Sequence, residues 1–313
     1  MAQSSLPAKA TPQKGNGVRK LKDQLTYYLM CAPGMLWLVL FSIVPMTGIL
    51  MAFQDYKPKK GIFGSKFIGL ENFEYLFSMK DARNVIVNTL IIALAKIVLN
   101  LIIPLTFALL LNEVRNMKYK RTVQTIVYLP HFLSWVILAS ILTNIFGFDG
   151  IVNKLAGLFG AEPQVLLANS KFFRGLVIGS DVWKEFGYNA VIYLAALTGI
   201  NPTLYEAAAI DGASRWQQTR FITLPSLSNT IVLLTVLALG NVLNAGFDQI
   251  FNMYNPLVYS TADIIDTWVY RIGLTKMQFS LATAAGLFKS LVSFVLITVS
   301  YFFAYKFADY TIF

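Results

Sequence analysis

The sequence predicts an all-α fold, a polytopic membrane protein in which six transmembrane helices form one bundle. The 313-residue chain is 56% hydrophobic and only 13% charged, and its mean hydropathy of +0.58 is far above that of a soluble domain. Six apolar segments approach the roughly 20 residues that a helix needs to cross the hydrocarbon core. The polar stretches between them are too short for a separate globular domain.

Residues 1–25 form a basic tail rich in Lys, Gln, Ser and Gly, which we expect to be disordered or bound to a surface. The tail is too long and polar to begin a normal cleaved signal, so the apolar stretch after it is expected to stay as a membrane helix. Residues 26–313 then make up the membrane domain.

The six segments are predicted from apolar length, and their ends are fixed by charged or turn-forming residues. The fourth is the most polar, because Asp181, Lys184 and Glu185 stand at its start. The predicted spans are Tyr27–Phe53, Asn84–Leu111, Thr122–Phe146, Val182–Ile200, Leu227–Phe251 and Ser280–Phe307.

An even number of spans places both termini on one side, and basic residues favour the cytoplasm for that side. The tail is basic, and so is the short loop that carries Arg115, Lys118, Lys120 and Arg121. The loop at 54–83 is also basic, although four acidic residues dilute its charge. We therefore expect cytoplasmic termini and outward loops at about 54–83, 147–181 and 252–279.

The net charge of +10 does not indicate nucleic-acid binding, because the basic residues are spread over flanks and loops. They are typical of segments beside an anionic leaflet of a lipid bilayer. The single cysteine, Cys31, excludes an intrachain disulfide, and the single histidine, His131, excludes a His-rich metal site. No metal ion or cofactor is expected to bind this chain.

A polar island at 201–226 separates the fourth and fifth predicted spans. Asn201 can cap a short helix that begins with proline, and Gly212 can supply a sharp turn. Ser214 and Gln217 have the spacing of a capping box, which predicts a second short helix. Such a helix-turn-helix buries little by itself, which suits a surface for another protein, but the spacing alone fits an ordinary loop with well-capped turns equally well.

The second short helix is expected to end before Pro225. The pattern Glu206-Ala207-Ala208, then Gly212, then Ile222-x-Leu224-Pro225 resembles the EAA motif of ABC importer permeases. In that family the loop is a coupling helix seated in a cleft of the cytoplasmic ATPase. The resemblance implies that Ala207, Ala208, Ile222 and Leu224 pack against the bundle, and that Glu206 is the main ATPase contact. The expected coupling residues are Glu206, Ala207, Ala208, Asp211, Gly212, Ser214 and Arg215.

Other stretches resemble the oligosaccharide branch of these permeases, and the likeness covers most of the chain from about residue 27. They are Met51–Tyr56 with Phe67–Phe73, Tyr128–Trp135 and Tyr254–Asp263. The likeness is greatest to permeases for aldouronate, polygalacturonan and alginate oligosaccharides.

The resemblance implies a type I importer in a bacterial inner membrane. Its further parts would be a second, non-identical permease, two ATPase subunits that bind ATP and Mg, and an extracytoplasmic solute-binding protein. The substrate would be an oligosaccharide, delivered by the binding protein, and ATP binding and hydrolysis would drive alternating access.

The chain has no phosphate-binding loop and no nucleophile constellation, so we expect no catalytic residue and no ATPase activity of its own. Two other classes stay open. A secondary transporter would show paired inverted repeats with broken helices and would need no ATPase. A membrane-bound enzyme would need a cluster of catalytic groups, and His131 has no obvious acidic partner nearby in the sequence.

Ionisable residues at bilayer depth are costly and often mark a transport path. At about 1.5 Å per residue, Lys289, Asn244 and Tyr188 lie roughly 13, 10 and 9 Å from the outer ends of their spans. An aromatic face and hydrogen-bonding groups suit a sugar, and a lysine suits a uronate carboxylate. The expected substrate-path residues are Trp183, Tyr188, Asn189, Asn244, Asp248 and Lys289.

The alternative for Lys289 is an ion pair with Asp248 or Glu185 that holds helices together. Lys96, in the second span, is expected to be structural or to reach towards the interface rather than to bind substrate.

Overall fold

The computed structural model describes residues 17–308, and the chain divides into two units, residues 1–50 and 51–313. Residues 1–16 of the predicted tail lie outside the described residues. The rest of the tail is already helical, because helix α1 (Gly17–Leu38) begins there.

The first unit is a helix that the π-helical turn η1 (Val39–Ile43) and the 3₁₀ helix η2 (Val44–Phe53) continue into the second unit. The stretch Tyr27–Phe53 is long and apolar enough to cross a membrane. This confirms the length and composition of the first predicted span.

The second unit opens with a small antiparallel hairpin, β1 (Gln54–Asp55) and β2 (Lys66–Phe67), around the single turn α2 (Gly61–Gly64). Helix α3 (Glu71–Ser78) follows. The side chain of Asn72 donates hydrogen bonds to the carbonyls of Ala52 and Gln54, which fixes the hairpin to α3.

Two long helices form the centre of this unit. Helix α4 (Lys80–Asn112) and helix α8 (Ser170–Thr198) make the most extensive helix pair in the fold. Between them in sequence lie α5 (Met117–Tyr128), η3 (Leu129–Phe132), α6 (Trp135–Phe146), α7 (Ile151–Leu158) and η4 (Leu166–Ala168). Gly187 of α8 allows α5 to approach closely, because a Cβ there would lie 2.3 Å from the carbonyl oxygen of Val127.

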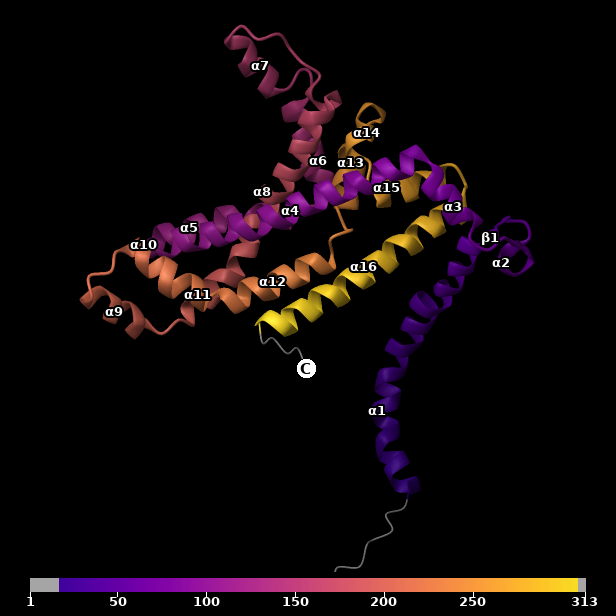
Figure 1. The fold of residues 1–313 in the computed structure, drawn as a ribbon, viewed down its shortest axis with the longest axis horizontal. Helices are drawn as coiled ribbons and strands as arrows, with labels where there is room; N and C mark the ends of the chain where they lie inside the picture. The colour runs from indigo at the N-terminus through magenta and orange to yellow at the C-terminus, as the bar shows by residue number, and fades with distance from the viewer. Residues whose placement is uncertain (1–16, 309–313) are drawn as a thin grey trace, which may run out of the picture. The chain divides into compact units, whose positions relative to one another are not determined.

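After α8 the chain forms α9 (Pro202–Ile210), α10 (Arg215–Gln218), the π-helical turn η5 (Thr219–Thr223), α11 (Leu224–Ser226) and α12 (Ser228–Gly240). It continues through α13 (Phe247–Met253), η6 (Pro256–Val258), α14 (Tyr259–Ala262), α15 (Ile265–Tyr270), η7 (Arg271–Thr275) and α16 (Phe279–Ala308). Figure 1 shows α12 and α16 side by side, with α9 and α10 at one end of the unit. The core lies between α4, α8 and the segments from α13 to α15, where Phe173, Ile250 and Ile264 are fully buried.

The structure confirms an all-α membrane fold but not the count of six spans. Within residues 17–308, four helical stretches are long and apolar enough to span, or five if the bent pair Arg215–Ser226 and Ser228–Gly240 is one span. Helix α8 has the length, but its charged residues make it more polar than the others.

Two predicted spans are interrupted. The third, Thr122–Phe146, breaks at η3, where Pro130 cannot continue the α-helical hydrogen bonds, and the spanning stretch is Trp135–Leu158 instead. The fifth, Leu227–Phe251, breaks between Gly240 and Phe247.

Candidate functional site

Residues 201–226, which we call the coupling segment, fold as the sequence predicts at their start and turn. The side chain of Asn201 accepts a hydrogen bond from the amide of Thr203, and Pro202 occupies the first helical position. Gly212 has a φ of +75°, a conformation that L-residues with side chains rarely adopt. The turn between α9 and α10 therefore depends on this glycine.

The predicted capping box at the start of α10 is confirmed. The amide of Ser214 donates to Oε1 of Gln217 at 2.7 Å, and the amide of Gln217 donates to Oγ of Ser214 at 3.4 Å. Each residue thus satisfies a backbone N–H that would otherwise lack a partner at a helix start.

The prediction that the second helix ends before Pro225 was wrong. The helix continues through the π-helical turn η5 and α11. The π-helical turn over Thr219–Thr223 widens the backbone just before the proline, and the hydroxyl of Thr223 donates to the carbonyl of Gln218. A π turn relieves the clash that a proline ring causes in a regular α-helix.

The coupling segment presents most of its signature residues to the outside. All the expected coupling residues are exposed except Ala208, which is half-buried. Ala207 was expected to pack against the bundle but is exposed, whereas Ile222 and Leu224 are half-buried. Large apolar side chains accompany the exposed residues: Ile210 is 87% and Trp216 68% exposed. An exposed apolar surface next to polar groups is typical of a protein-binding site.

Few contacts hold the coupling segment to the rest of the unit. Arg215 forms an exposed ion pair of 3.4 Å with Glu113 at the end of α4. Within the segment itself, the Tyr205 hydroxyl lies 2.9 Å from the Thr223 hydroxyl and joins α9 to the π-helical turn. These residues and the polar side chains around them line a small cavity of about 230 Å³.

A second candidate region is a cavity of about 280 Å³ between α4, α8 and the end of α12. The amides of Asn189, Asn241 and Asn244 line it together with Tyr193, and its deeper wall contains Lys96 and Asp181. It therefore combines apolar surface and hydrogen-bonding groups, as a sugar site requires, although the ring of Tyr193 is itself buried and only 1% exposed.

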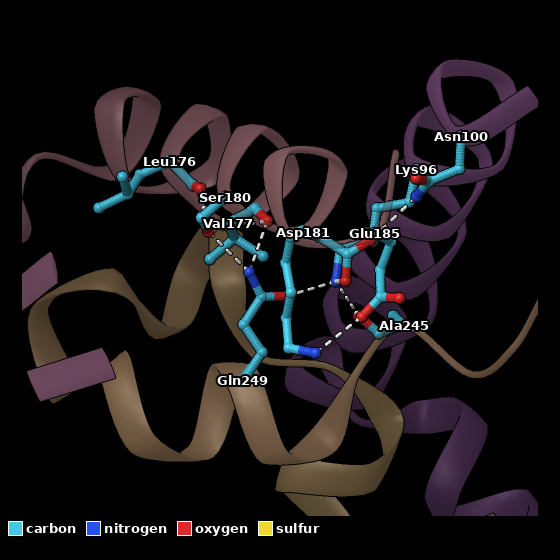
Figure 2. A network of polar contacts seen from close by, with 10 residues as sticks. Lys96, Asn100, Leu176, Val177, Ser180, Asp181, Glu185, Ala245 and Gln249 are labelled. Carbon is cyan, nitrogen blue, oxygen red and sulfur yellow. Dashed lines mark hydrogen bonds and ion pairs between the residues drawn. The ribbon is translucent and has the colours of Figure 1, made fainter. Parts of the chain in front are cut away.

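A buried polar network supports the deeper wall (Figure 2). The Lys96 ammonium lies 3.0 Å from Oδ1 of Asp181 and donates to Oε1 of Gln249 and to the carbonyl of Ala245. Asn100 donates to Oδ2 of Asp181 at 3.0 Å. Lys96 is thus held in a buried network, which agrees with the structural role that was one of its two expected alternatives. Gln249 is a further residue of this site that the sequence analysis did not single out.

Of the expected substrate-path residues, only Asn189 and Asn244 line this cavity. Trp183 lines a different, apolar groove between α6 and α8, and Asp248 is exposed on α13. Lys289 is paired with Asp266 at 2.6 Å, and not with Asp248 or Glu185.

Tyr188 stacks on His131, for which the sequence analysis found no acidic partner. The rings of Tyr188 and His131 stack with centroids 3.9 Å apart, and Nδ1 of His131 lies 2.7 Å from Oε2 of Glu185. Lys184 donates both to Glu185 and to the carbonyl of His131. The break at η3 brings these residues together, and no sequence spacing indicates it.

The stretch Tyr254–Asp263 folds around the buried carboxylate of Asp263. Arg271 and the hydroxyl of Thr267 both donate to this carboxylate, and the Arg271 guanidinium lies 4.1 Å from the ring centre of Tyr259. Burial raises the pKa of the Asp263 carboxyl, even though both donors act in the opposite direction. This cluster fixes the chain between α14 and η7.

Among residues 17–308, no three His, Cys, Asp or Glu side chains gather as a metal ion would require.

Comparison with known proteins bears on both regions. A family model described as "binding-protein-dependent transport system inner membrane component" matches residues 101–309, which is more than half of the chain. The match includes the coupling segment and the cavity wall formed by α8, the end of α12 and residues 241–246.

Two relatives from Bacillus subtilis (strain 168) are similar over nearly the whole chain. The polygalacturonan/rhamnogalacturonan transport system permease protein YteP is 42% identical, with 93% of this chain and 91% of the relative covered. The protein LplB is 41% identical, with 92% of this chain and 91% of the relative covered.

The fold matches a chain in a crystal structure of a bacterial ABC transporter involved in the import of the acidic polysaccharide alginate. The TM-score is 0.85 at 37% identity, and the match covers 93% of this chain and 98% of that chain. A second structure, of a bacterial alginate ABC transporter in complex with alginate pentasaccharide-bound periplasmic protein, gives a TM-score of 0.84 at the same identity. That match covers 92% of this chain and 96% of the other.

Proposed function

Because this chain belongs to the family of binding-protein-dependent transport system inner membrane components, and is therefore an ABC importer permease, we propose that it translocates acidic oligosaccharides. Its fold is that of a type I ABC importer permease. The proposed substrates are short chains of uronate sugars, delivered by a solute-binding protein.

The similar proteins support this substrate class. One is named for polygalacturonan and rhamnogalacturonan, and another belongs to an importer of the acidic polysaccharide alginate. These polymers share sugar rings that carry carboxylates. The cavity beside α8 is the proposed passage, because its amides can bond to hydroxyls and its apolar side chains, such as Ile97 and Ile192, can pack against the face of a ring.

The coupling segment carries the functional proposal. Two short, capped helices present the EAA-type residues and the apolar side chains of Ile210 and Trp216 to the outside, with few contacts to their own chain. We infer that an ATPase subunit covers this surface. In the proposed assembly two ATPase subunits bind ATP and Mg, a second permease completes a heterodimer, and this chain performs no covalent chemistry.

Contact with cytoplasmic ATPases requires the coupling segment to face the cytoplasm. With an even number of spans, both termini of the chain would then also be cytoplasmic. The proposed location is a bacterial inner membrane, in agreement with the description of the family.

Uptake by the complete importer in proteoliposomes tests the proposal. The assay would compare oligogalacturonates with the same oligosaccharides after methyl esterification, which removes the charge and adds one methyl group to each carboxyl. We expect ATP-dependent uptake of the free acids that exceeds uptake of the esters and disappears without the ATPase subunits. Uptake without ATPase would overturn the importer mechanism, and equal uptake of acid and ester would overturn the acidic substrate class.

A further inference from the structure

The chain leaves the α-helix between α12 and α13, and this break forms part of the cavity wall. Helix α12 ends at Gly240, helix α13 begins at Phe247, and Gly246 has a φ of +97°. Asn241 and Asn244 lie in the break and line the cavity. At membrane depth, backbone outside a helix is tolerated only where it is buried in protein or lines a cavity. Something must therefore hold this segment in place.

The Lys96 ammonium is placed to do so. It has three N–H groups, and the structure gives them three acceptors: Asp181, the carbonyl of Ala245 and Gln249. Lys96 as a whole residue is only 6% exposed. Each N–H group already has an acceptor, and Asp181 balances the charge. The ammonium therefore has no free hydrogen-bond donor for a substrate carboxylate.

The second half of the network ties the other end of the break to α8. Nε2 of Gln249 donates to the carbonyl of Val177 at 2.7 Å and to Oγ of Ser180 at 2.9 Å (Figure 2). Gln249 is fully buried. The residues on the two sides of Gly246 are thus both held: Ala245 by α4, and Gln249 by α4 and α8.

Gly246 leaves the room that this arrangement needs. A Cβ at this position would lie 2.9 Å from Nζ of Lys96. Its positive φ also disfavours any residue with a side chain. Glycine is therefore required both by the backbone of the break and by the approach of the ammonium.

We propose that Lys96, Asp181 and Gln249 are positioning residues for the substrate passage. Together with the Ala245 carbonyl they form a clasp, which holds residues 241–246 so that Asn241 and Asn244 face the cavity. The clasp affects substrate binding only through the positions of these asparagines. Lys96 does not contact the carboxylates of the substrate. The inference rests on the proposed function only in taking the cavity as the passage.

A buried cysteine can report on the clasp without any transport. Cys31→Ser removes the only cysteine, and Val242→Cys then places one in the break, where Val242 is 4% exposed. In the assembled importer we expect a small maleimide to label this cysteine slowly. Lys96→Met should raise the labelling rate at least about tenfold, because local opening controls access to buried groups.

Lys289→Met is the matched control. Lys289 is also a lysine within a membrane helix and also has an acidic partner, Asp266, but it does not touch the break. Its labelling rate should stay within about twofold of the parent. If Lys96→Met fails to assemble, Gly246→Ala gives a milder test, since it keeps all the clasp side chains but displaces the ammonium, and it should raise the rate several-fold.

The double variant Lys96→Met/Asp181→Leu separates positioning from the simple harm of an unpaired buried charge. Removing both charges should restore much of the thermal stability that Lys96→Met loses. The labelling rate at residue 242 should nevertheless stay high, because the Ala245 carbonyl and Gln249 have still lost their donor. A labelling rate that returns to the parent value together with stability would overturn the proposal.

Transport kinetics test the same point on substrate. We expect Lys96→Met to raise the KM about tenfold and to leave the maximal rate within about twofold, as loss of binding-site geometry does. Acidic and methyl-esterified oligosaccharides should lose affinity by the same factor. A loss confined to the acids would make Lys96 a direct carboxylate ligand and would contradict the clasp. The labelling experiment stands even if the importer carries no acidic oligosaccharide.

Discussion

The coupling segment and the clasp each hold a sharp change of direction between two helices, but they do so by opposite means. In the coupling segment, bonds such as those between Ser214 and Gln217 join residues three positions apart, and the side chains are exposed. In the clasp, Lys96 reaches Ala245 and Gln249, which are 149 and 153 positions away, and the side chains are buried.

The difference indicates which interactions stabilise each region: local caps in the coupling segment, and buried long-range contacts in the clasp. A local cap contributes about 1 kcal/mol and leaves the surface free for a partner. A buried ion pair depends on every member, because removal of one partner leaves a charge without compensation. We therefore expect changes in the coupling segment to affect transport far more than stability, and changes at buried contacts to affect both.

Glu206→Lys should have the largest effect and would show that the coupling segment acts through its partner. A charge reversal at an interface costs several kcal/mol, so uptake should fall at least about a hundredfold while the unfolding midpoint stays unchanged. Gly212→Pro should also abolish uptake, because proline cannot adopt the φ of +75° that the turn requires, while the protein should still insert into the membrane. Glu162→Lys, an equal charge change at another exposed residue, is the control. Normal uptake by both coupling variants at normal membrane levels would rule out the coupling role.

Gly187→Ala should have the next largest effect, on stability. The added Cβ would lie 2.3 Å from the Val127 carbonyl, and such overpacking costs about 1–3 kcal/mol. Gly179→Ala, in the same helix but with no atom within 4 Å of the new Cβ, is the matched control. Thermal unfolding in detergent compares the two. Equal midpoints would mean that α5 and α8 are not in close contact in the folded protein.

Ser214→Ala should cost about 1 kcal/mol, and only locally. Amide hydrogen exchange should quicken at the start of α10 and stay unchanged in α4 and α8. Ser226→Ala removes a hydroxyl that bonds only to the carbonyl of Ile222 one turn earlier, and it serves as the control. Unchanged exchange in α10 would show that the cap does not stabilise the coupling segment.

Arg215→Ala should have the smallest effect on stability, below about 1 kcal/mol, because its pair with Glu113 is exposed. A double-mutant cycle with Glu113→Ala measures the coupling energy. A value well above this limit would mean that the coupling segment is fixed to α4 more firmly than the geometry indicates.

The sequence was sufficient where the determining contacts are close along the chain. The helix start at Asn201, the glycine turn and the capping box all follow from residue types within a few positions, and the structure confirms them. The family resemblance and the all-α membrane fold were also predicted correctly. Helix continuation through Pro225 was missed because a π-helical turn has no clear sequence signal.

Partners far apart in sequence could not be predicted. Depth counting placed Lys289 and Tyr188 at one level with Asn244, but it could not tell which face of each helix points inwards. Lys289 turned out to face Asp266, and Tyr188 to face His131. Gln249 had only one signal, a polar residue inside an apolar segment, and its role depends on three elements that meet only after folding.

The break at residues 241–246 also has a consequence for solvent. Asn241 and Asn244 are exposed amides on the cavity wall, and lipid tails offer them no hydrogen-bond partners. Water must therefore enter this recess whenever no sugar occupies it, even though apolar side chains line much of its wall. An arriving oligosaccharide would then displace ordered water from these amides, and its hydroxyls would bond to the amides in place of that water.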